Sequence, residues 1–358
     1  MTDGHGDDIH RYGDIRINFS SNVYCHFNHD GLFEYLSRQM ESIRNYPEPS
    51  QDTAAKAVAE AFHLQPGEVM VTNGATEGIY LTSLAFRRSL SAIVVPTFSE
   101  YADACLMHEH RIVCINSLDD IPQEAHLAWI CNPNNPTGRV HDKATLLQIV
   151  KSRPNTLFII DASYAPFTRK PLISPTEAVR QPNILMLHSM TKEFAIPGLR
   201  LGYITANKSL FSKIRALQMP WSVNSMAQHA CQYLLSHKQD YTLPIDMLLQ
   251  ERLRVGKAFE DCGMIETMPS DTHILLCRLK NAKASFLKDN LARNHGILIR
   301  DASNFAGLDD TYFRIAVQTP AENNQLINAI TTILSHKFPQ NPLIPQNPLL
   351  PINPIPHQ

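Results

Sequence analysis

Short runs of apolar residues, many of them β-branched, recur along the first two thirds of the chain and are separated by amphipathic segments. These runs are VMVT, AIVVP, RIVCI, LAWIC, TLFIID, ILMLHS and LGYIT. Strands that are apolar on both faces are typical of a sheet covered by helices on both sides. Strands that alternate with helical patterns favour parallel connections. The pattern predicts an α/β fold with a mostly parallel central sheet, each strand of which is covered on both faces.

A helix is predicted just before the first of these strands. Its apolar residues fall on one helical face: Ala55, Val58, Ala59 and Phe62. Ser50 is the expected cap at the start of this helix, and Pro66-Gly67 ends it.

The pattern of apolar and polar residues changes from about Asn224 onward. Two long helical patterns are followed by THILLCRL, a helix, GILIR, YFRIAV and a final helix. The residues Thr319-Pro320-Ala321-Glu322 form a capping box with proline at the first helical position of that last helix. We therefore expect a smaller α+β domain at 224–337, after an N-terminal arm at 1–30 and a large domain at 31–223.

The segment 338–358 has a composition of its own. It lacks Lys, Arg, Asp and Glu, and prolines recur at every third position from 339 to 354 and again at 356. This spacing matches the three residues per turn of polyproline II. We expect a proline-rich tail outside the packed core, and a P-x-x-P ligand for a partner protein is the alternative.

Composition narrows the classes of function. The 358 residues are 44% apolar and 18% charged, with a formal charge of -2, so there is no basic excess for nucleic acid. No run of about 18 apolar residues predicts a membrane span. The start MTDGHGDD is acidic, unlike a secretory signal, and the seven cysteines contain no C-x-x-C. We expect a cytoplasmic protein with reduced thiols and neither nucleic-acid nor membrane partners.

One loop combines three groups suited to an anionic cofactor. Ser189 and Lys192 lie in Ser-Met-Thr-Lys, and Arg200 follows eight residues later in Pro-Gly-Leu-Arg-Leu-Gly-Tyr. A hydroxyl and a guanidinium suit a phosphate. A lysine among cations and apolar walls has a lowered pKa and becomes a nucleophilic amine.

Other polar motifs follow the predicted strands, where open α/β sheets bind their ligands. Asn132 to Gly138 follows LAWIC, Asp161 to Tyr164 follows TLFII, and Asn73 to Glu77 opens a helix whose N-terminus can receive an anion. Tyr101, after PTFSE, offers a flat ring for stacking. Each motif is weak alone, since turns and caps also use these residue types.

Together and in this order, the motifs resemble those of the class I/II aminotransferase family, which has fold type I and uses pyridoxal 5'-phosphate. The resemblance covers about residues 5–336. It implies that Lys192 binds the cofactor covalently and that Asp161 pairs with its pyridine nitrogen. Tyr164 and Asn135 would bind the ring oxygen, and Tyr101 would stack on the ring. Lys192, Asp161 and Tyr164 are then the predicted catalytic residues.

The same resemblance implies a phosphate cup and a homodimer. The cup residues are Ala75, Thr76, Ser189 and Arg200. Tyr46, in Arg-Asn-Tyr-Pro, matches a tyrosine that reaches the cofactor phosphate of the neighbouring subunit. No metal site is expected, because His108-Glu109-His110 lacks further ligands at metal spacing.

Within the family, the finer motifs resemble threonine-phosphate decarboxylases more than histidinol-phosphate aminotransferases. The run Gln218 to Asn224, QMPWSVN, discriminates best. The implied substrate-binding residues are His5, Gly6, Asn22, Asn135, Arg300 and Arg314. Two arginines suit a small phosphorylated amino acid with two anionic ends, although the sequence does not assign an end to each.

The expected activity is therefore decarboxylation of L-threonine O-3-phosphate to (R)-1-amino-2-propanol O-2-phosphate, a product that the resemblance links to cobalamin biosynthesis. A histidinol-phosphate-type aminotransferase is the first alternative. A non-catalytic partner-binding protein on the same fold is the second. Three departures from the family pattern stand out: Asp161-Ala162-Ser163-Tyr164 lacks a glutamate, His5-Gly6 lacks a second glycine, and Val23 to Phe27 replace the usual N-P-x-G after Asn22.

Overall fold

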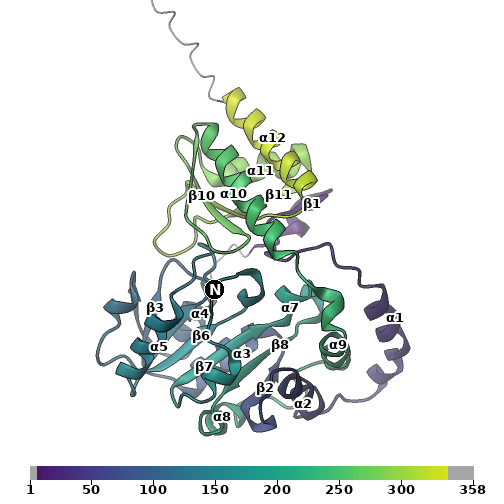
Figure 1. Cartoon of the computed structure of the whole chain (residues 1–358), viewed down its shortest axis with the longest axis vertical. Helices are drawn as coiled ribbons and strands as arrows, with labels where there is room; N and C mark the ends of the chain where they lie inside the picture. Colours follow the sequence, from purple (N-terminus) through teal and green to yellow (C-terminus); the bar gives the residue numbers. More distant parts are fainter. Residues whose placement is uncertain (1–5, 338–358) are drawn as a thin grey trace, which may run out of the picture.

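The structure, a computed structural model, describes residues 6–337. The predictions for His5 and for the proline-rich tail at 338–358 lie outside the described residues. Figure 1 shows two parts, a larger one built on the central sheet and a smaller one that contains the last three helices.

Within residues 6–337, the larger part has a seven-stranded sheet of order β2-β8-β7-β6-β5-β3-β4. Its strands are β2 (Val69–Thr72), β3 (Leu90–Val94), β4 (Arg111–Ile115), β5 (Leu127–Cys131), β6 (Leu157–Asp161), β7 (Ile184–Ser189) and β8 (Gly202–Ala206). All neighbouring pairs are parallel except those of β8, which runs antiparallel to β2 and β7. The mostly parallel α/β sheet predicted from the apolar runs is confirmed.

Helices cover both faces of this sheet. They are α1 (Asp30–Arg38), α2 (Asp52–Ala61), α3 (Gly74–Ala85), α4 (Glu100–Met107), α5 (Lys143–Ser152), α6 (Pro175–Ala178), α7 (Met190–Glu193), α8 (Lys208–Arg215) and α9 (Ser225–Ser236). Successive strand residues point to opposite sides. Ile159 of β6 therefore joins the core on the side of α3 and α4, whereas Ile160 joins the core on the side of α5.

The smaller part is an α+β unit. A four-stranded antiparallel sheet of order β12-β13-β10-β9 uses β9 (Ile265–Thr267), β10 (Ile274–Leu279), β12 (Arg300–Asp301) and β13 (Tyr312–Ala316). Its helices are α10 (Ile245–Asp261), α11 (Ala284–His295) and α12 (Pro320–Lys337). The predicted capping box of α12 is confirmed, since Thr319 N donates to Glu322 and Glu322 N donates to the Thr319 hydroxyl.

An N-terminal arm joins the smaller part through a separate two-stranded parallel sheet. Strand β1 (Ile17–Asn18) pairs with β11 (Ile297–Leu298). The domain division at 223/224 remains our proposal. Helix α9, just beyond it, packs against α1 and α2 beside the large sheet.

Short 3₁₀ helices connect these elements. They are η1 (Ile9–Arg11), η2 (Met40–Arg44), η3 (Pro66–Glu68), η4 (Leu118–Asp120), η5 (Ala165–Phe167), η6 (Pro197–Leu199) and η7 (Lys238–Tyr241). Of the helices in residues 6–337, none has the length and apolar character that crossing a membrane requires.

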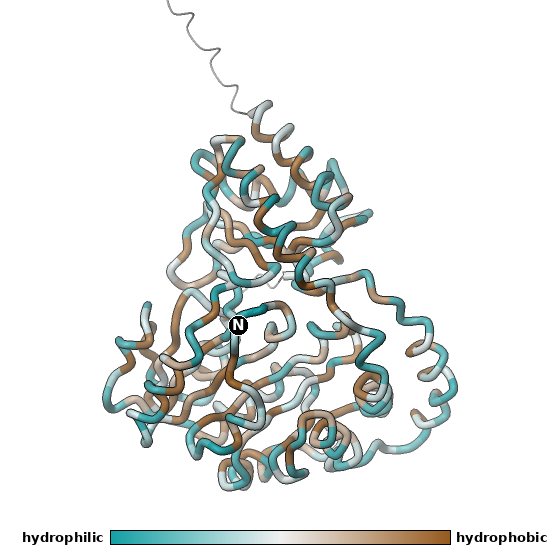
Figure 2. The backbone as a smooth tube through the Cα atoms, viewed as in Figure 1, coloured by the Kyte–Doolittle hydropathy of each residue, from teal (hydrophilic) through white to brown (hydrophobic). Residues whose placement is uncertain are grey.

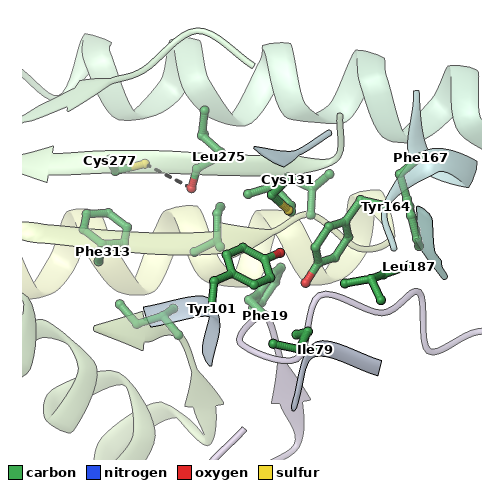
Figure 3. Packing of buried hydrophobic residues seen from close by; sticks show 14 of the residues in the cluster. Phe19, Ile79, Tyr101, Cys131, Tyr164, Phe167, Leu187, Leu275, Cys277 and Phe313 are labelled. Atoms are coloured by element: carbon green, nitrogen blue, oxygen red, sulfur yellow. Dashed lines mark hydrogen bonds between the residues drawn. The ribbon is translucent and has the colours of Figure 1, made fainter. Parts of the chain in front are cut away.

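One hydrophobic core continues through both parts. Leu187 and Phe167 of the larger part belong to the same buried cluster as Leu275 and Phe313 of the smaller part (Figure 3). Hydrophobic segments run through the interior of both parts, while hydrophilic residues are frequent in the outer helices and loops (Figure 2). Because this core is shared and close-packed, it holds the side chains of the two parts that face each other in fixed positions.

Two predictions about local structure are wrong. The N-cap of α2 is Gln51, in the left-handed region at φ 54°, and the Ser50 hydroxyl donates to Asp52 instead. The Glu48 carboxylate accepts the N–H of Thr53 in the first turn. Strand β4, the run RIVCI, lies at the sheet edge beside β3 and is partly exposed, so it is not covered on both faces as predicted.

Candidate active site

A cavity of about 240 Å³ lies at the carboxyl ends of the central strands, between the two parts of the molecule. It brings together most of the residues that the sequence predicted. Those lining it are Gly6, Asn22, Ala75, Thr76, Tyr101, Asn135, Asp161, Tyr164, Ser189, Lys192, Arg200 and Arg314. Their convergence follows from the parallel strands, whose ends deliver successive loops to one sheet edge.

Lys192 lies in the short helix α7, directly after β7. Its Nζ donates to the backbone oxygen of Ser21 at 2.8 Å. Burial lowers the pKa of Lys192 to about 8, and the charges of Arg314 and Arg200 act in the same direction. About a tenth of the amine is therefore neutral and nucleophilic at pH 7, far more than for an ordinary lysine.

Asp161 ends β6 and is buried. Its carboxylate accepts hydrogen bonds from the Tyr101 hydroxyl at 2.6 Å and from the backbone N–H of Ser163 at 2.9 Å. Burial raises the pKa of this carboxyl, and the hydrogen bonds from Ser163 and Tyr101 lower it. The nearby Tyr164 hydroxyl accepts a hydrogen bond from Asn22 at 3.0 Å. Figure 3 shows Tyr101 and Tyr164 within this buried cluster.

The start of α3 and the loop before β8 bring together the residues that the sequence predicted to form a phosphate cup. Gly74 has φ 74°, and a Cβ there would lie 2.5 Å from a guanidinium nitrogen of Arg200. At Gly202 a Cβ would lie 2.5 Å from the backbone nitrogen of Ala75. Both glycines therefore allow a close approach that places Arg200 beside the N–H groups of a helix N-terminus, a favourable site for a phosphate.

Arg314 is buried at the boundary of two cavities. It donates to the Asn135 side chain and to the Ser20 carbonyl, each at 2.5 Å. Its Nε has no partner among the described residues. Burial lowers the pKa of Arg314 to about 9, with the nearby Arg300 acting in the same direction.

Arg300 lies directly opposite Arg314 on the paired strands β12 and β13. It lines a smaller adjoining cavity of about 40 Å³, together with Gly6, Asn135 and Arg314. Its guanidinium donates to Asn304 at 2.7 Å and lies 5.5 Å from the ring centre of Phe305. Among the described residues, no carboxylate lies within ion-pair distance of either arginine, although the charges of Asp301 and Asp8 act on Arg300 from farther away.

Tyr46 lies outside this chain's cavity. Its side chain is 84% exposed, and its ring lies 5.1 Å from that of Trp221. The role that the resemblance gives to Tyr46 concerns a second subunit and stays a prediction.

Sequence reasoning missed several lining residues. They are Asp7, Ser20, Ser21, Ile79, Phe98, Cys131, Ser163, Thr191 and Pro197. Most of them are next to motif residues in the sequence, and this adjacency is the feature that could have identified them. Ser20 and Ser21 contribute backbone carbonyls, which side-chain chemistry does not reveal. Asp7 adopts φ 65° where the family pattern has a glycine.

Comparison with known proteins places the chain in a family. Residues 14–330 match the family Aminotransferase class I and II. The chain belongs to this family. A solved L-threonine-O-3-phosphate decarboxylase from Porphyromonas gingivalis is 37% identical, with a TM-score of 0.87, and the match covers 89% of this chain and all of that one.

Two curated relatives point to different activities. A histidinol-phosphate aminotransferase from Caldanaerobacter subterraneus is 28% identical, over 82% of this chain and 85% of that protein. The adenosylcobalamin biosynthesis bifunctional protein CobDQ of Leptospira interrogans is also 28% identical, over 88% of this chain. The chain spans only 38% of that bifunctional protein's length.

Enzymes of this family depend on pyridoxal 5'-phosphate, which confirms the predicted cofactor. The cavity fits that group. It offers cations for a phosphate and a buried carboxylate for a ring nitrogen, and the buried Thr191 Oγ1 and Asn22 Oδ1 have no partner among the described residues. Unpartnered buried polar atoms are costly unless a ligand or water satisfies them.

Proposed function

We propose that the protein decarboxylates L-threonine O-3-phosphate to (R)-1-amino-2-propanol O-2-phosphate. The observation that carries the proposal is the pair of buried arginines, Arg300 and Arg314, opposite each other beside the cofactor cavity and without a carboxylate partner among the described residues. Two such cations require anions, and this substrate carries a phosphate and a carboxylate. The motif Gln218 to Asn224 and the similarity to the Porphyromonas decarboxylase support the same choice.

The position of each arginine suggests its task. Arg314 lines both cavities, so we assign it to the substrate carboxylate, which lies next to the reacting carbon. Arg300 lines only the smaller cavity, so we assign it to the phosphate. Gly6, Asn22 and Asn135 complete the substrate-binding wall, with His5 preceding them in the sequence.

The remaining side chains prepare the chemistry. When bound, pyridoxal 5'-phosphate supplies an electron sink for the pair released at the substrate's α-carbon. Asp161 holds a proton on the ring nitrogen, and Tyr164 and Asn135 orient the ring oxygen. Ala75, Thr76, Ser189 and Arg200 hold the cofactor phosphate. The Lys192 amine, held at the Ser21 carbonyl, binds the cofactor and returns a proton to the α-carbon after carbon dioxide leaves.

Loss of the carboxylate rather than of the α-proton is the distinctive step, and the choice between them would depend on how the chain's own residues hold the substrate. Arg314, by binding the carboxylate, would favour its loss. The main alternative, a histidinol-phosphate-type aminotransferase, would use the same cavity but would remove the α-proton instead. It is favoured by the similarity to the Caldanaerobacter aminotransferase.

A substrate comparison tests the proposal. The holoenzyme is incubated with L-threonine O-3-phosphate or, in a separate mixture, with histidinol phosphate, and no keto acid is added to either mixture. We expect carbon dioxide from the first mixture and no conversion of the cofactor to its amine form. Accumulation of the amine form without carbon dioxide would support the aminotransferase instead. Inertness toward both mixtures, with cofactor bound, would favour a non-catalytic protein.

Substitution of each arginine tests its task. Arg300→Lys is expected to raise KM for the phosphorylated substrate at least tenfold, since lysine lacks the planar fork that binds phosphate through two hydrogen bonds. Arg314→Lys is expected to lower kcat more than it raises KM. The reverse pattern would exchange the two assignments.

We also propose a homodimer in which Tyr46 reaches the neighbouring cavity. Supporting it are the exposed apolar side chains of Phe33, Ile43, Tyr46, Met219 and Trp221, of which the Tyr46 and Trp221 rings are in contact. Large exposed apolar groups in contact with each other are typical of protein interfaces. Light scattering on the holoenzyme should give twice the 40.3 kDa chain mass; a monomer with full activity would contradict the proposal.

A further inference from the structure

The carboxylate of Asp161 has a side-chain donor that the proposed chemistry does not require. Tyr101 donates its hydroxyl to Oδ2 at 2.6 Å, while the Ser163 backbone N–H donates to Oδ1 at 2.9 Å. Asp161 is only 5% exposed and Tyr101 only 1%. A carboxyl so buried becomes neutral unless donors stabilise its charge.

The Tyr101 ring is fixed independently of this hydrogen bond. It stacks on Trp129 of β5 with ring centres 5.5 Å apart and planes 20° apart, and it meets Phe98 edge-on at 5.8 Å. These contacts aim the hydroxyl at Asp161. Burial raises the pKa of Tyr101 well above its usual value, so the phenol keeps its proton and can donate it to the Asp161 carboxylate.

The titratable groups around Asp161 come from four neighbouring segments. They are Tyr101 of α4, Cys131 of β5, Tyr164 after β6 and Lys192 of α7. Burial raises the pKa of both the Cys131 thiol and the Tyr164 phenol, so neither supplies a charge. Apart from the Lys192 cation, the groups that stabilise a charged Asp161 are therefore Ser163 and Tyr101.

We propose that the hydroxyl of Tyr101 keeps Asp161 ionised and oriented in the cofactor-free protein, and so prepares the cavity for the positively charged ring nitrogen of pyridoxal 5'-phosphate. A carboxylate has about four acceptor sites, so Asp161 can accept the ring N–H besides Tyr101 and Ser163. Tyr101 is thus a positioning residue in addition to its stacking role. The inference rests on pairing of Asp161 with the ring nitrogen and is independent of the reaction that follows.

The first test measures the protonation of Asp161 directly. Infrared spectra of the cofactor-free protein are recorded against pH, and Asp161→Asn identifies the band of the protonated carboxyl. In Tyr101→Phe we expect the titration midpoint to rise by about one pH unit, a tenfold gain in proton affinity. An unchanged midpoint would overturn the proposal.

The wild-type protein provides a test that does not depend on the folding of any Tyr101 variant. At pH 7 its infrared spectrum should contain no protonated-carboxyl band that Asp161→Asn removes. If such a band is present, Asp161 is neutral beside Tyr101, and the proposal is wrong.

Cofactor affinity gives a second readout. The dissociation constant for pyridoxal 5'-phosphate is measured in Tyr101→Phe at acidic and at mildly alkaline pH. Relative to wild type, we expect about tenfold weaker binding at the acidic pH and near-normal binding at the alkaline pH, because a protonated Asp161 cannot pair with the ring. A loss of equal size at both pH values would indicate a packing defect and contradict the proposal.

Tyr80→Phe is the matched control. It removes the hydroxyl of Tyr80, in α3. That hydroxyl donates at 2.8 Å to Glu100 of α4, the helix that also carries Tyr101, and both residues lie outside the cavity. Its Asp161 titration and its cofactor affinity should equal those of wild type. If this control reproduces the effects of Tyr101→Phe, loosening of α4 explains them and the proposal fails.

Discussion

Lys192 lies among groups with opposing effects on its protonation. Burial and two neighbouring arginines favour the neutral amine, whereas Asp7 and Asp161 favour the cation, and the net result is a pKa of about 8. The neutral amine is the form that reacts with an aldehyde. Protonation of this one residue should therefore govern how fast the cofactor-free protein captures its cofactor.

We expect the rate constant for capture of pyridoxal 5'-phosphate to rise about tenfold per pH unit below pH 8 and to level off above it, because the neutral fraction of a group with pKa 8 follows that curve. Stopped-flow absorbance on the cofactor-free protein measures this rate. Lys192→Ala should form no covalent adduct. A rate that keeps rising to about pH 10 would show that Lys192 has the pKa of an ordinary lysine.

The sequence predicted which side chains line the cavity better than it predicted which backbone groups do. Lys192, Asp161 and Arg200 were identifiable because their motifs occur together and in the order of the family, although each motif is weak alone. The carbonyls of Ser20 and Ser21, which hold Arg314 and Lys192, depend on how the arm folds back across the molecule. No local pattern encodes that contact.

At the scale of elements, strand β8 positions the residues that we propose as the phosphate cup. Its antiparallel pairing places Gly202 opposite Thr72 of β2 and Ser189 of β7. This glycine contacts the backbone at the start of α3, so the helix N-terminus and the loop carrying Arg200 come together at one point.

Gly202→Ala should therefore damage both stability and cofactor binding. The added methyl would meet backbone atoms of Ala75 and His188 at 2.5 and 2.8 Å, which can move only with their elements. We expect a loss of about 2 kcal/mol in unfolding free energy, with weaker affinity for pyridoxal 5'-phosphate. Chemical denaturation and cofactor titration measure the two effects.

Gly198→Ala is the control for this prediction, since a Cβ there would have no neighbour within 4 Å. It should leave stability and affinity near wild type. Equal losses in the two variants would show that the cup does not depend on the close approach at Gly202.

The pattern of apolar residues predicted which segments are helices or strands, but it did not predict which elements lie next to each other. The apolar runs indicated strands correctly, yet RIVCI became an edge strand because sheet order is decided by tertiary packing. Likewise Ser50 has the chemistry of a cap, but the chain enters α2 through a left-handed Gln51. Such choices depend on the whole path of the backbone rather than on local propensity.

At the scale of the whole molecule, the N-terminal arm links the smaller part to the cavity. Lys288 of α11 forms an ion pair with Asp8 at 2.6 Å, with side chains 10% and 9% exposed. Tyr12 donates to Asp289 of the same helix at 2.6 Å. The arm residues that line the cavity, Gly6 and Asp7, directly precede this anchor.

Lys288→Met should loosen the arm. It leaves the buried Asp8 carboxylate with only the more distant Arg11, at 4.0 Å, which costs about 3 kcal/mol of unfolding free energy. We also expect KM for the substrate to rise more than kcat falls, because we propose that the arm forms part of the substrate wall. Denaturation and steady-state kinetics provide the measurements.

Lys283→Met is the matched variant on the same part of the molecule. Its ion pair with Asp310, at 2.8 Å, is exposed to solvent, so its loss should cost less than about 1 kcal/mol and leave KM unchanged. Similar effects from both variants would indicate that the arm is not anchored through Lys288.

The central claim, decarboxylation of L-threonine O-3-phosphate, is tested most directly by following the reaction in D₂O by ¹H and ³¹P nuclear magnetic resonance. We predict consumption of the substrate, release of carbon dioxide and an aminopropanol phosphate that carries one deuterium on the carbon that lost the carboxylate. Exchange of the α-proton with retention of the carboxylate, accompanied by a keto acid, would contradict decarboxylation and establish the aminotransferase instead.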